Sequence, residues 1–444
     1  MLSELKEKFN NNYVEVIIQR KKFSGQLFIE KNKCILEVYI EEKDFEKYFR
    51  SLDKEYELLC GRLIPNDTLI TFIDCWNVGG SSTVIDNRGD IYKCKGKLRF
   101  NCHSIILGTN LKSLNKSEIT NTKVTYDKID DFFSKKIVEN VFLMKDIKII
   151  PENNSYKIKS GIIEFNNYPS ISEQSNCYTI KSNPIVSINY KSSTTFNKNH
   201  TNIYKYRNLL MILLKKPIII NKYTISVNSA EHLVYEFGNT NLEIDLNELN
   251  EIVSHRRIKI ENINNFADVL EKFNKHYNKI YLTLEEIYNY VFYDLPWLNR
   301  FVNSINMIES LAGTYFEKQA LKRTINEYYK KPNAKKCNEP KNSNFIDQTI
   351  VLIKNVNNIF NFSDSEIENI GEVIKDTRIF LFHYSEKKKK QINKKKVKEE
   401  EQIKLAYFIE DVIMLNIYLL LGLHTNNKDA LSFYDFYYNK NDLT

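Results

Sequence analysis

The spacing of apolar residues changes character near Ile203, and this change constrains the fold more than any single motif does. Before it, β-branched and aromatic residues form alternating or short continuous runs that are typical of strands, at residues 13–18, 27–40, 69–73 and 98–107. From Ile263 onward, apolar residues recur at the three- and four-residue spacing of helices. The sequence therefore predicts an α+β protein, with a β-rich N-terminal domain followed by an all-helical bundle.

The same patterns predict where the parts begin and end. We expect a β-rich domain over residues 1–202, with a sensing or regulatory role, a mixed helical connector over 203–285 and a helical domain over 286–444. A chain of 444 residues is long enough for such parts to bury their own cores. The pair Gly79-Gly80 lacks the following Gly-Lys-Ser/Thr of a phosphate-binding loop, so we interpret it as a hairpin turn between strands.

Helical periodicity predicts the helices of the second half. Their expected ranges are 204–214, 264–278, 283–293, 296–329, 345–361, 363–382 and 399–423. The longest apolar run, at 408–423, is interrupted by Glu410, Asp411 and Asn416, which favours a buried helix over a membrane span. With a polar start at residues 1–8, the sequence predicts a cytoplasmic protein that does not associate with membranes.

The cysteines and histidines give little sign of a metal centre. The seven cysteines form no CxxC pair, and Cys94, Cys102 and His103 lie in a strand-like stretch that no second ligand pair follows. We therefore predict no metal and no cofactor. The histidines other than His383, with His103 and His200 among them, are interpreted as structural or surface residues.

Positive charge is concentrated in one segment of the helical part. The whole chain carries a net charge of +8, but from residue 286 onward 23 Lys and Arg stand against 21 Asp and Glu. The local excess comes from a lysine run made of Lys387, Lys388, Lys389, Lys390, Lys394, Lys395 and Lys396. Two interpretations remain open: a solvated charge run, or a patch that follows a phosphate backbone.

An arginine interrupts the apolar stripe of the helix expected at 363–382. At about 100° per residue, Ile367, Ile370, Ile374 and Leu381 share one face, and Arg378 falls on it. An arginine that faces a core needs an acidic partner or an anionic ligand. Glu309, at the edge of the buried stripe of the 296–329 helix, is one candidate. An ordinary half-exposed glutamate is the alternative.

His383 follows Arg378 by five positions. In an unbroken helix the two side chains would point about 140° apart, so they would not converge within one regular helix. Either the helix ends near Phe382, or His383 meets the arginine of another subunit, or His383 is a surface residue just past the last turn. An arginine together with a histidine that titrates near neutrality is what a metal-free phosphodiester-cleaving site needs.

The segment 377–384, Thr-Arg-Ile-Phe-Leu-Phe-His-Tyr, resembles the Arg-x4–6-His signature of the HEPN superfamily of helical ribonucleases. It is similar to the Thr-Arg-Asn-x-x-x-His-Tyr pattern of ApeA-type anti-phage proteins, which join a β-rich N-terminal domain to a C-terminal HEPN domain. Residues 307–309, 23–27 and 69–75 resemble further segments of that group. Ile379 departs from the pattern, because the family usually has Asn, Asp or His there.

This resemblance implies a metal-independent endoribonuclease that acts in abortive infection. Arg378 and His383 would be catalytic, Glu309, Thr377 and Tyr384 would support them, and the lysine run would guide the RNA, tRNA being one candidate. It also implies a homo-oligomer formed through the helical domain and a phage-derived trigger. The alternative is an inactive HEPN-like module that binds nucleic acid or protein, or that dimerises. Ile379 favours this alternative, whereas the place of Arg378 on the apolar stripe favours the nuclease.

Overall fold

The computed structural model divides the chain into two compact units. The first comprises Met1–Asp130, Lys135–Arg207 and Ile219–Asp245, and the second comprises Asp131–Ser134, Asn208–Ile218 and Leu246–Thr444. The structure describes residues 12–30, 33–41, 55–64, 66–85, 93–116, 118–127, 129–133, 138–139, 148–149, 151–174, 177–237, 257–291, 296–315, 345–382 and 399–423.

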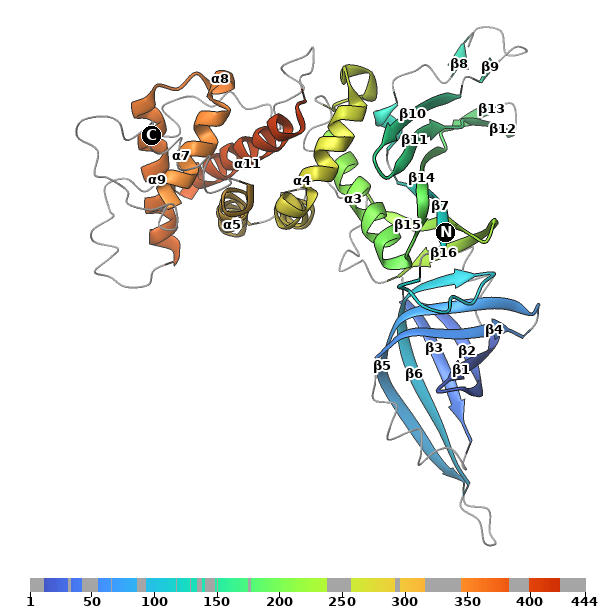
Figure 1. The fold of residues 1–444 in the computed structure, drawn as a ribbon. Coiled ribbons are helices and arrows are strands. Elements are labelled where there is room, and N and C mark those ends of the chain that lie inside the picture. Colours follow the sequence, from blue (N-terminus) through green and yellow to red (C-terminus); the bar gives the residue numbers. More distant parts are fainter. Residues whose placement is uncertain are drawn as a thin grey trace. The chain divides into compact units, whose positions relative to one another are not determined.

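Six antiparallel strands of the first unit close into a barrel (Figure 1). They are β1 (Asn12–Ile18), β2 (Lys21–Glu30), β3 (Lys33–Ile40), β4 (Tyr56–Leu63), β5 (Thr68–Ile85) and β6 (Lys93–Leu107). The pairing runs from β6 through β3, β2, β1 and β4 to β5, which pairs again with β6. Alternate side chains of each strand, such as Phe23, Leu27 and Phe100, point inward and form the barrel core.

The barrel corrects two details of the sequence prediction. The run 27–40 is not one strand, because β2 ends at Glu30 and the antiparallel β3 begins at Lys33. Gly79-Gly80 is not a hairpin turn: both residues lie inside β5, opposite Arg99 and Leu98 of β6. Gly79 has a φ of +137° where the register shifts, so glycine there accommodates a bulge in a long strand rather than a reversal.

β6 also connects the barrel to the rest of the sheet. The additional strands follow in the order β16 (Ala230–Glu236), β15 (Ile220–Val227), β7 (Ile119–Tyr126), β14 (Pro184–Thr194), β11 (Gly161–Asn167) and β10 (Glu152–Ile158). Two short strand pairs are separate, namely β8 (Val138–Glu139) with β9 (Lys148–Ile149), and β12 (Ser170–Gln174) with β13 (Cys177–Lys181). A 3-10 turn, η1, spans Asp130–Phe132.

Helix α3 (Phe196–Leu214) packs on this part of the sheet. Its Ile203 carbonyl accepts a hydrogen bond from Tyr126 Oη on β7 at 2.8 Å. Its buried Asn199 accepts hydrogen bonds from Thr122 on β7 and from Tyr190 on β14. The helix begins eight residues before the predicted start at residue 204, because polar residues of its first turns face the sheet through hydrogen bonds rather than through apolar contact.

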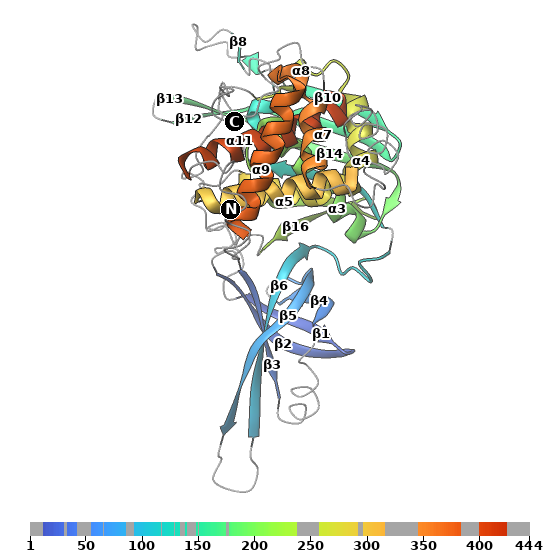
Figure 2. The ribbon, with the colours of Figure 1, turned by 90° about the vertical axis from the view of Figure 1, so that its left-hand side faces the viewer.

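The second unit is helical (Figures 1 and 2). Its elements are η2 (Ile260–Asn262), α4 (Phe266–Glu286), the π-helical turn η3 (Ile287–Val291), α5 (Trp297–Tyr315), α7 (Phe345–Asn355), α8 (Asn357–Phe360), α9 (Asp364–Phe382) and α11 (Glu399–Leu421). The helices predicted at 264–278 and 283–293 are one continuous element, α4 with η3. The segment 331–344, between the helices predicted at 296–329 and 345–361, lies outside the described residues.

The centre of the helical unit is α11, which confirms the predicted buried helix. Two of the polar residues that interrupt its apolar run form hydrogen bonds with neighbouring helices of the unit. Asn416 donates to the Leu352 carbonyl of α7 at 2.9 Å, and buried Glu410 accepts from Arg300 Nη2 of α5 at 2.9 Å. No helix in the described part of the chain is long and apolar enough to cross a membrane. The α+β fold class predicted from the sequence is confirmed.

Candidate functional site

The arginine of the predicted motif lies near the end of the described part of α9. A capping box starts this helix, in which Ser363 Oγ accepts from the Glu366 N–H and Glu366 Oε2 accepts from the Ser363 N–H. Arg378 stands seven residues after Gly371, and therefore on the same face two turns later. A Cβ at Gly371 would lie 3.1 Å from Ile350 of α7. The glycine thus allows α7 and α9 to approach closely below the arginine.

Two groups from two other helices hold the guanidinium of Arg378. Its Nη2 lies 2.6 Å from Glu309 Oε1 of α5, so the counter-ion considered from the sequence is in place. Its Cζ lies 4.5 Å from the ring centroid of Phe345, the first residue of α7. An ion pair fixes one edge of the planar group while the ring supports one face, so the orientation of Arg378 is defined by two contacts.

Burial at this end of α9 differs from the predicted stripe. Thr377 is completely buried, whereas the side chain of Arg378 is 33% exposed and Leu381 is half-buried. The prediction that Arg378 points into the core is therefore only partly correct, because 33% of its side chain is exposed to solvent. Ile367, Ile370 and Ile374 do form the buried face, but the arginine reaches its edge, where solvent and a ligand have access.

The guanidinium keeps donors for a ligand. Arginine has five N–H donors, and within the described residues the contacts of Arg378 are the Glu309 carboxylate and the Phe345 ring. Glu309 is itself 43% exposed, so the pair is a surface interaction. The buried Thr377 hydroxyl has no hydrogen-bond partner among the described residues. An oriented and partly solvated arginine of this kind suits a phosphate oxygen.

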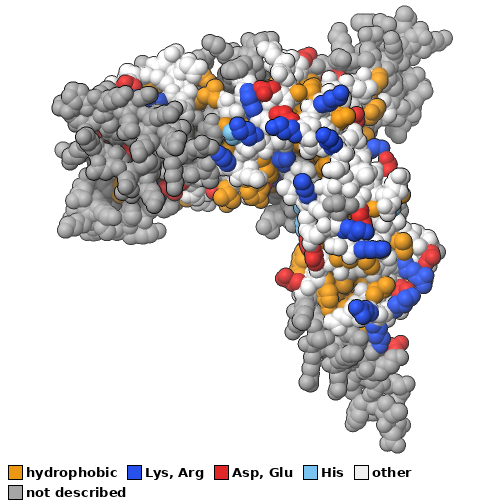
Figure 3. Space-filling view, in the orientation of Figure 1, with side chains coloured by type: hydrophobic (Ala, Val, Ile, Leu, Met, Phe, Trp, Pro, Cys, Tyr) orange, Lys and Arg blue, Asp and Glu red, His pale blue; other side chains and the backbone are white. Residues whose placement is uncertain are grey.

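The remaining predicted site residues cannot be placed. His383, Tyr384 and the lysine run lie outside the described residues, and the description of α9 stops at Phe382. On the face shown in Figure 3, Lys and Arg side chains are spread over both units and are not confined to the helical part. The described surface therefore does not by itself mark a path for RNA.

Two family models together match most of the chain. Residues 10–291 match the model described as ApeA N-terminal domain 1, and residues 302–427 match the model described as Apea-like HEPN. The first match covers more than half of the chain. The chain belongs to the ApeA-type HEPN proteins. The family resemblance stated from segment 377–384 is confirmed. Neither a curated protein nor a solved structure matches the chain.

The Apea-like HEPN match contains both the arginine and the histidine of the predicted motif. It includes Glu309 of α5, Arg378 of α9, and His383. The HEPN family includes ribonucleases, which agrees with the reaction class inferred from the sequence. Sequence reasoning missed Phe345 and Gly371. The glycine had a signal, since a small residue seven positions before Arg378 on an apolar stripe marks close helix packing.

Proposed function

We propose that this protein is a metal-independent endoribonuclease that cleaves RNA by attack of the 2′-hydroxyl on the adjacent phosphate. The observation that carries the proposal is the guanidinium of Arg378, which is part-exposed and oriented by Glu309 and Phe345 five residues before a histidine. Membership of a family that includes ribonucleases supports the same class of reaction.

Arg378 has the electrostatic role. Attack by the 2′-oxygen places extra negative charge on the non-bridging phosphate oxygens, and a guanidinium offers them paired donors at a fixed spacing. Because Glu309 and Phe345 orient the group before RNA arrives, little reorganisation is needed when the charge develops.

His383 has the proton-transfer role. An imidazole with a pKa near neutrality can remove the 2′-hydroxyl proton or donate a proton to the leaving 5′-oxygen. The 2′-oxygen forms a bond to phosphorus as the bond to the 5′-oxygen breaks, so the products carry a 2′,3′-cyclic phosphate and a 5′-hydroxyl. RNA supplies its own nucleophile, and neither forming the new bond to phosphorus nor breaking the old one requires a metal.

We further propose that two copies associate through the helical unit, so that His383 of one chain reaches Arg378 of the other. The 140° angle between the two positions on one regular helix favours this arrangement. Mixing Arg378→Ala protein with His383→Ala protein tests it, because one intact site forms in each mixed dimer. Recovery of cleavage supports a shared site, whereas a mixture as inactive as its components contradicts it.

The biological setting is part of the proposal. An RNA-cleaving protein that acts in abortive infection must stay inactive until infection, which calls for a phage-derived trigger and for restraint by the β-rich part. The lysine run at 387–396 would follow the phosphate backbone of the RNA, with tRNA as one candidate substrate. Ile379 favours the second candidate function, an inactive binding or dimerisation module.

Incubating the purified 444-residue chain with total RNA in EDTA separates these candidates. We expect cleavage with cyclic phosphate and 5′-hydroxyl ends, and a loss of about 100-fold or more in Arg378→Ala and in His383→Ala. Lys375→Ala is the matched control, because Lys375 lies on the same helix, is 34% exposed and, among the described residues, forms its ion pair with the neighbouring Asp376. Because the proposal includes restraint until infection, the assay is run with and without an extract of phage-infected cells, and the extract alone gives the background. Absence of cleavage above this background by the unaltered protein in both conditions, or cleavage that persists in both variants, rejects the nuclease.

A further inference from the structure

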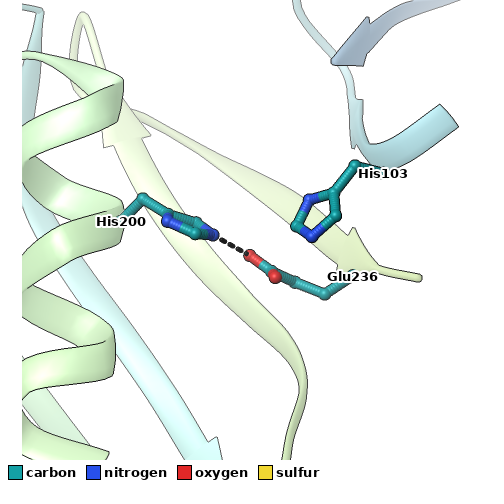
Figure 4. Close-up of side chains that lie close together, drawn as sticks. All are labelled: His103, His200 and Glu236. Atoms are coloured by element: carbon teal, nitrogen blue, oxygen red, sulfur yellow. Dashed lines mark ion pairs between the residues drawn. The ribbon is translucent and has the colours of Figure 1, made fainter. Parts of the chain in front are cut away.

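Three side chains of the first unit converge far from the candidate nuclease residues in the sequence (Figure 4). They are His103 of β6, His200 of α3 and Glu236 of β16, and one ligand atom from each lies within 4.8 Å of the others. Within the described part of the chain, this is the group of His, Cys, Asp or Glu side chains with the geometry to hold a metal ion. All three residues belong to the same compact unit.

Strand pairing brings His103 and Glu236 together. On one side of β6, Cys102 pairs with Cys34 of β3, and Ser104 pairs with Glu236 of β16. His103 therefore stands at the position where β6 exchanges one neighbour for another. Its carbonyl accepts a hydrogen bond of 2.7 Å from the N–H of Phe237, directly after Glu236. Because side chains alternate along a strand, Cys102 points into the barrel and His103 points out of it.

Helix α3 supplies the third side chain from above the sheet. The ring of His200 lies between two aromatic rings on the same helix face, 6.2 Å from Phe196 and 4.6 Å from Tyr204 between ring centroids. These residues are four positions apart, so one stripe of α3 fixes the imidazole and directs it at Glu236. Figure 4 shows a nitrogen of each imidazole facing the carboxylate.

The carboxylate of Glu236 is buried, and one of its two oxygens accepts no hydrogen bond from the described residues. The side chain of Glu236 is 1% exposed, and its Oε2 accepts a hydrogen bond of 2.7 Å from Tyr204 Oη. Oε1 lies 3.3 Å from His200 Nε2, yet neither atom has a hydrogen-bond partner among the described residues. Burial acts to raise the pKa of Glu236, but its interactions with His200 and Tyr204 outweigh this and the pKa is lowered.

We propose that His103, His200 and Glu236 bind a zinc ion. Two imidazoles and one carboxylate are a ligand set that zinc uses when its fourth position holds water. A buried carboxylate oxygen and a buried imidazole nitrogen that face each other without a hydrogen bond are atoms directed at such an ion.

The distance between His200 and Glu236 and the surrounding hydrogen bonds fit zinc. Bonds of about 2.0–2.2 Å in tetrahedral geometry hold ligand atoms roughly 3.4 Å apart, which is close to the 3.3 Å between His200 Nε2 and Glu236 Oε1. A ligating histidine usually has its other ring nitrogen hydrogen-bonded. His103 Nδ1 lies 3.0 Å from Ser104 Oγ, and Tyr204 holds the second oxygen of Glu236.

The competing explanation is an ion pair, in which a protonated His200 neutralises Glu236 and His103 is a neighbour without a role. The two explanations differ in what His103 does. A pair needs only His200, whereas zinc needs all three side chains. The nearby Cys102 is no substitute ligand, because its side chain belongs to the barrel core and points to the opposite side of β6 from His103.

Zinc binding is tested on the full-length protein after removal of metals with EDTA and transfer to metal-free buffer. With zinc added and the excess removed by gel filtration, we expect about one zinc per chain by elemental analysis and a raised melting temperature. His103→Gln, His200→Gln and Glu236→Gln should each hold at least about 10-fold less zinc, and Tyr204→Phe should bind it about 10–100-fold more weakly. His232→Gln, on the same strand as Glu236, is the matched control and should bind normally.

Two results overturn the proposal. One is an unaltered protein that holds no zinc above background and whose melting temperature zinc does not change. The other is zinc retained in full by His103→Gln or His200→Gln. Visible absorption of the cobalt(II)-loaded unaltered protein needs no variant to fold, and the absence of ligand-field bands there contradicts the site as well. The inference is independent of RNA cleavage, since every readout is metal binding.

Discussion

The described part of the helical unit contains two arginine–glutamate pairs. Their residue types are the same, but one pair is buried and the other is exposed. Arg300 and Glu410 are 2% and 1% exposed, whereas Arg378 and Glu309 are 33% and 43% exposed. Both arginines also lie over an aromatic ring, at 4.4 Å from Tyr407 and 4.5 Å from Phe345. Arg300 additionally donates to the Val291 carbonyl at 3.0 Å. The first pair fastens α5 to α11, and the second keeps an oriented cation within reach of solvent.

The difference teaches that burial, rather than residue type, separates a structural pair from a candidate functional one. A charge inside a protein must be neutralised by a fixed partner, because the cost of leaving it unpaired is large. A charge at the surface contributes little stability and can exchange its partner for a ligand. Four experiments extend this comparison.

The largest effect is expected at the buried pair. Arg300→Ala leaves the carboxylate of Glu410 buried without its cation and should lower the free energy of unfolding by about 3–5 kcal/mol in a urea titration. The double variant Arg300→Met with Glu410→Leu should lose less than the single variant, because no unpaired charge remains. A double variant less stable than Arg300→Ala would show that the pair contributes net stability.

At the exposed pair, activity and stability should separate. Arg378→Ala should change the free energy of unfolding by no more than about 1 kcal/mol, while RNA cleavage falls by about 100-fold. The urea midpoint and the cleavage rate of the same preparation check this, with Lys375→Ala as the reference. A large loss of stability in Arg378→Ala would place it with Arg300 as a structural residue.

A smaller effect is expected when only the orientation of Arg378 is disturbed. Glu309→Gln keeps the size of the side chain and removes its charge, so the guanidinium retains the Phe345 ring but loses its ion pair. We expect a loss of about 10-fold in the cleavage rate at saturating RNA with KM nearly unchanged, because the misplacement matters most in the transition state. A rise in KM at constant kcat would instead assign Glu309 to RNA binding.

The smallest effect concerns Glu286, a half-buried carboxylate for which no cationic partner lies among the described residues. Burial raises the pKa of Glu286 on α4 to about 7 from an ordinary 4.5, and its Oε2 has no hydrogen-bond partner among the described residues. The folded state therefore binds this proton more tightly than the unfolded state, and stability should fall as the pH rises from about 4.5 to 7. Glu286→Gln should be more stable than the unaltered protein at pH 8 and equal to it at pH 4. Identical melting curves at both pH values would contradict the shift.

Periodicity and charge logic predicted much of this from the sequence alone. The helical pattern gave α9 and α11, and the cost of an arginine on an apolar stripe pointed to Glu309 as its counter-ion. Both inferences rest on rules that act within one helix or between adjacent stripes. The domain boundaries at 202 and 285 and the catalytic roles stay predictions.

Contacts that depend on how distant helices pack or distant strands pair could not be predicted from the sequence in this way. Phe345 supports Arg378 because α7 packs on α9, and no local pattern announces that packing. His103 meets Glu236 because β6 exchanges β3 for β16 at one residue, so the pairing of distant strands decides the contact. The long strand β5 shows the same limit. From the sequence alone Gly79-Gly80 indicates a turn, but pairing with β6 keeps both residues within the strand.

The position of β6 has a consequence for how this protein can be divided. β5 is bonded along one edge of the strand, while β3 and then β16 are bonded along the other. Excising the barrel would strip β16 of its neighbour, and excising the remainder would expose the end of β6 as an open edge, which invites aggregation. Chimaeras within the family should therefore exchange the whole β-rich part as one cassette, with no crossover inside it.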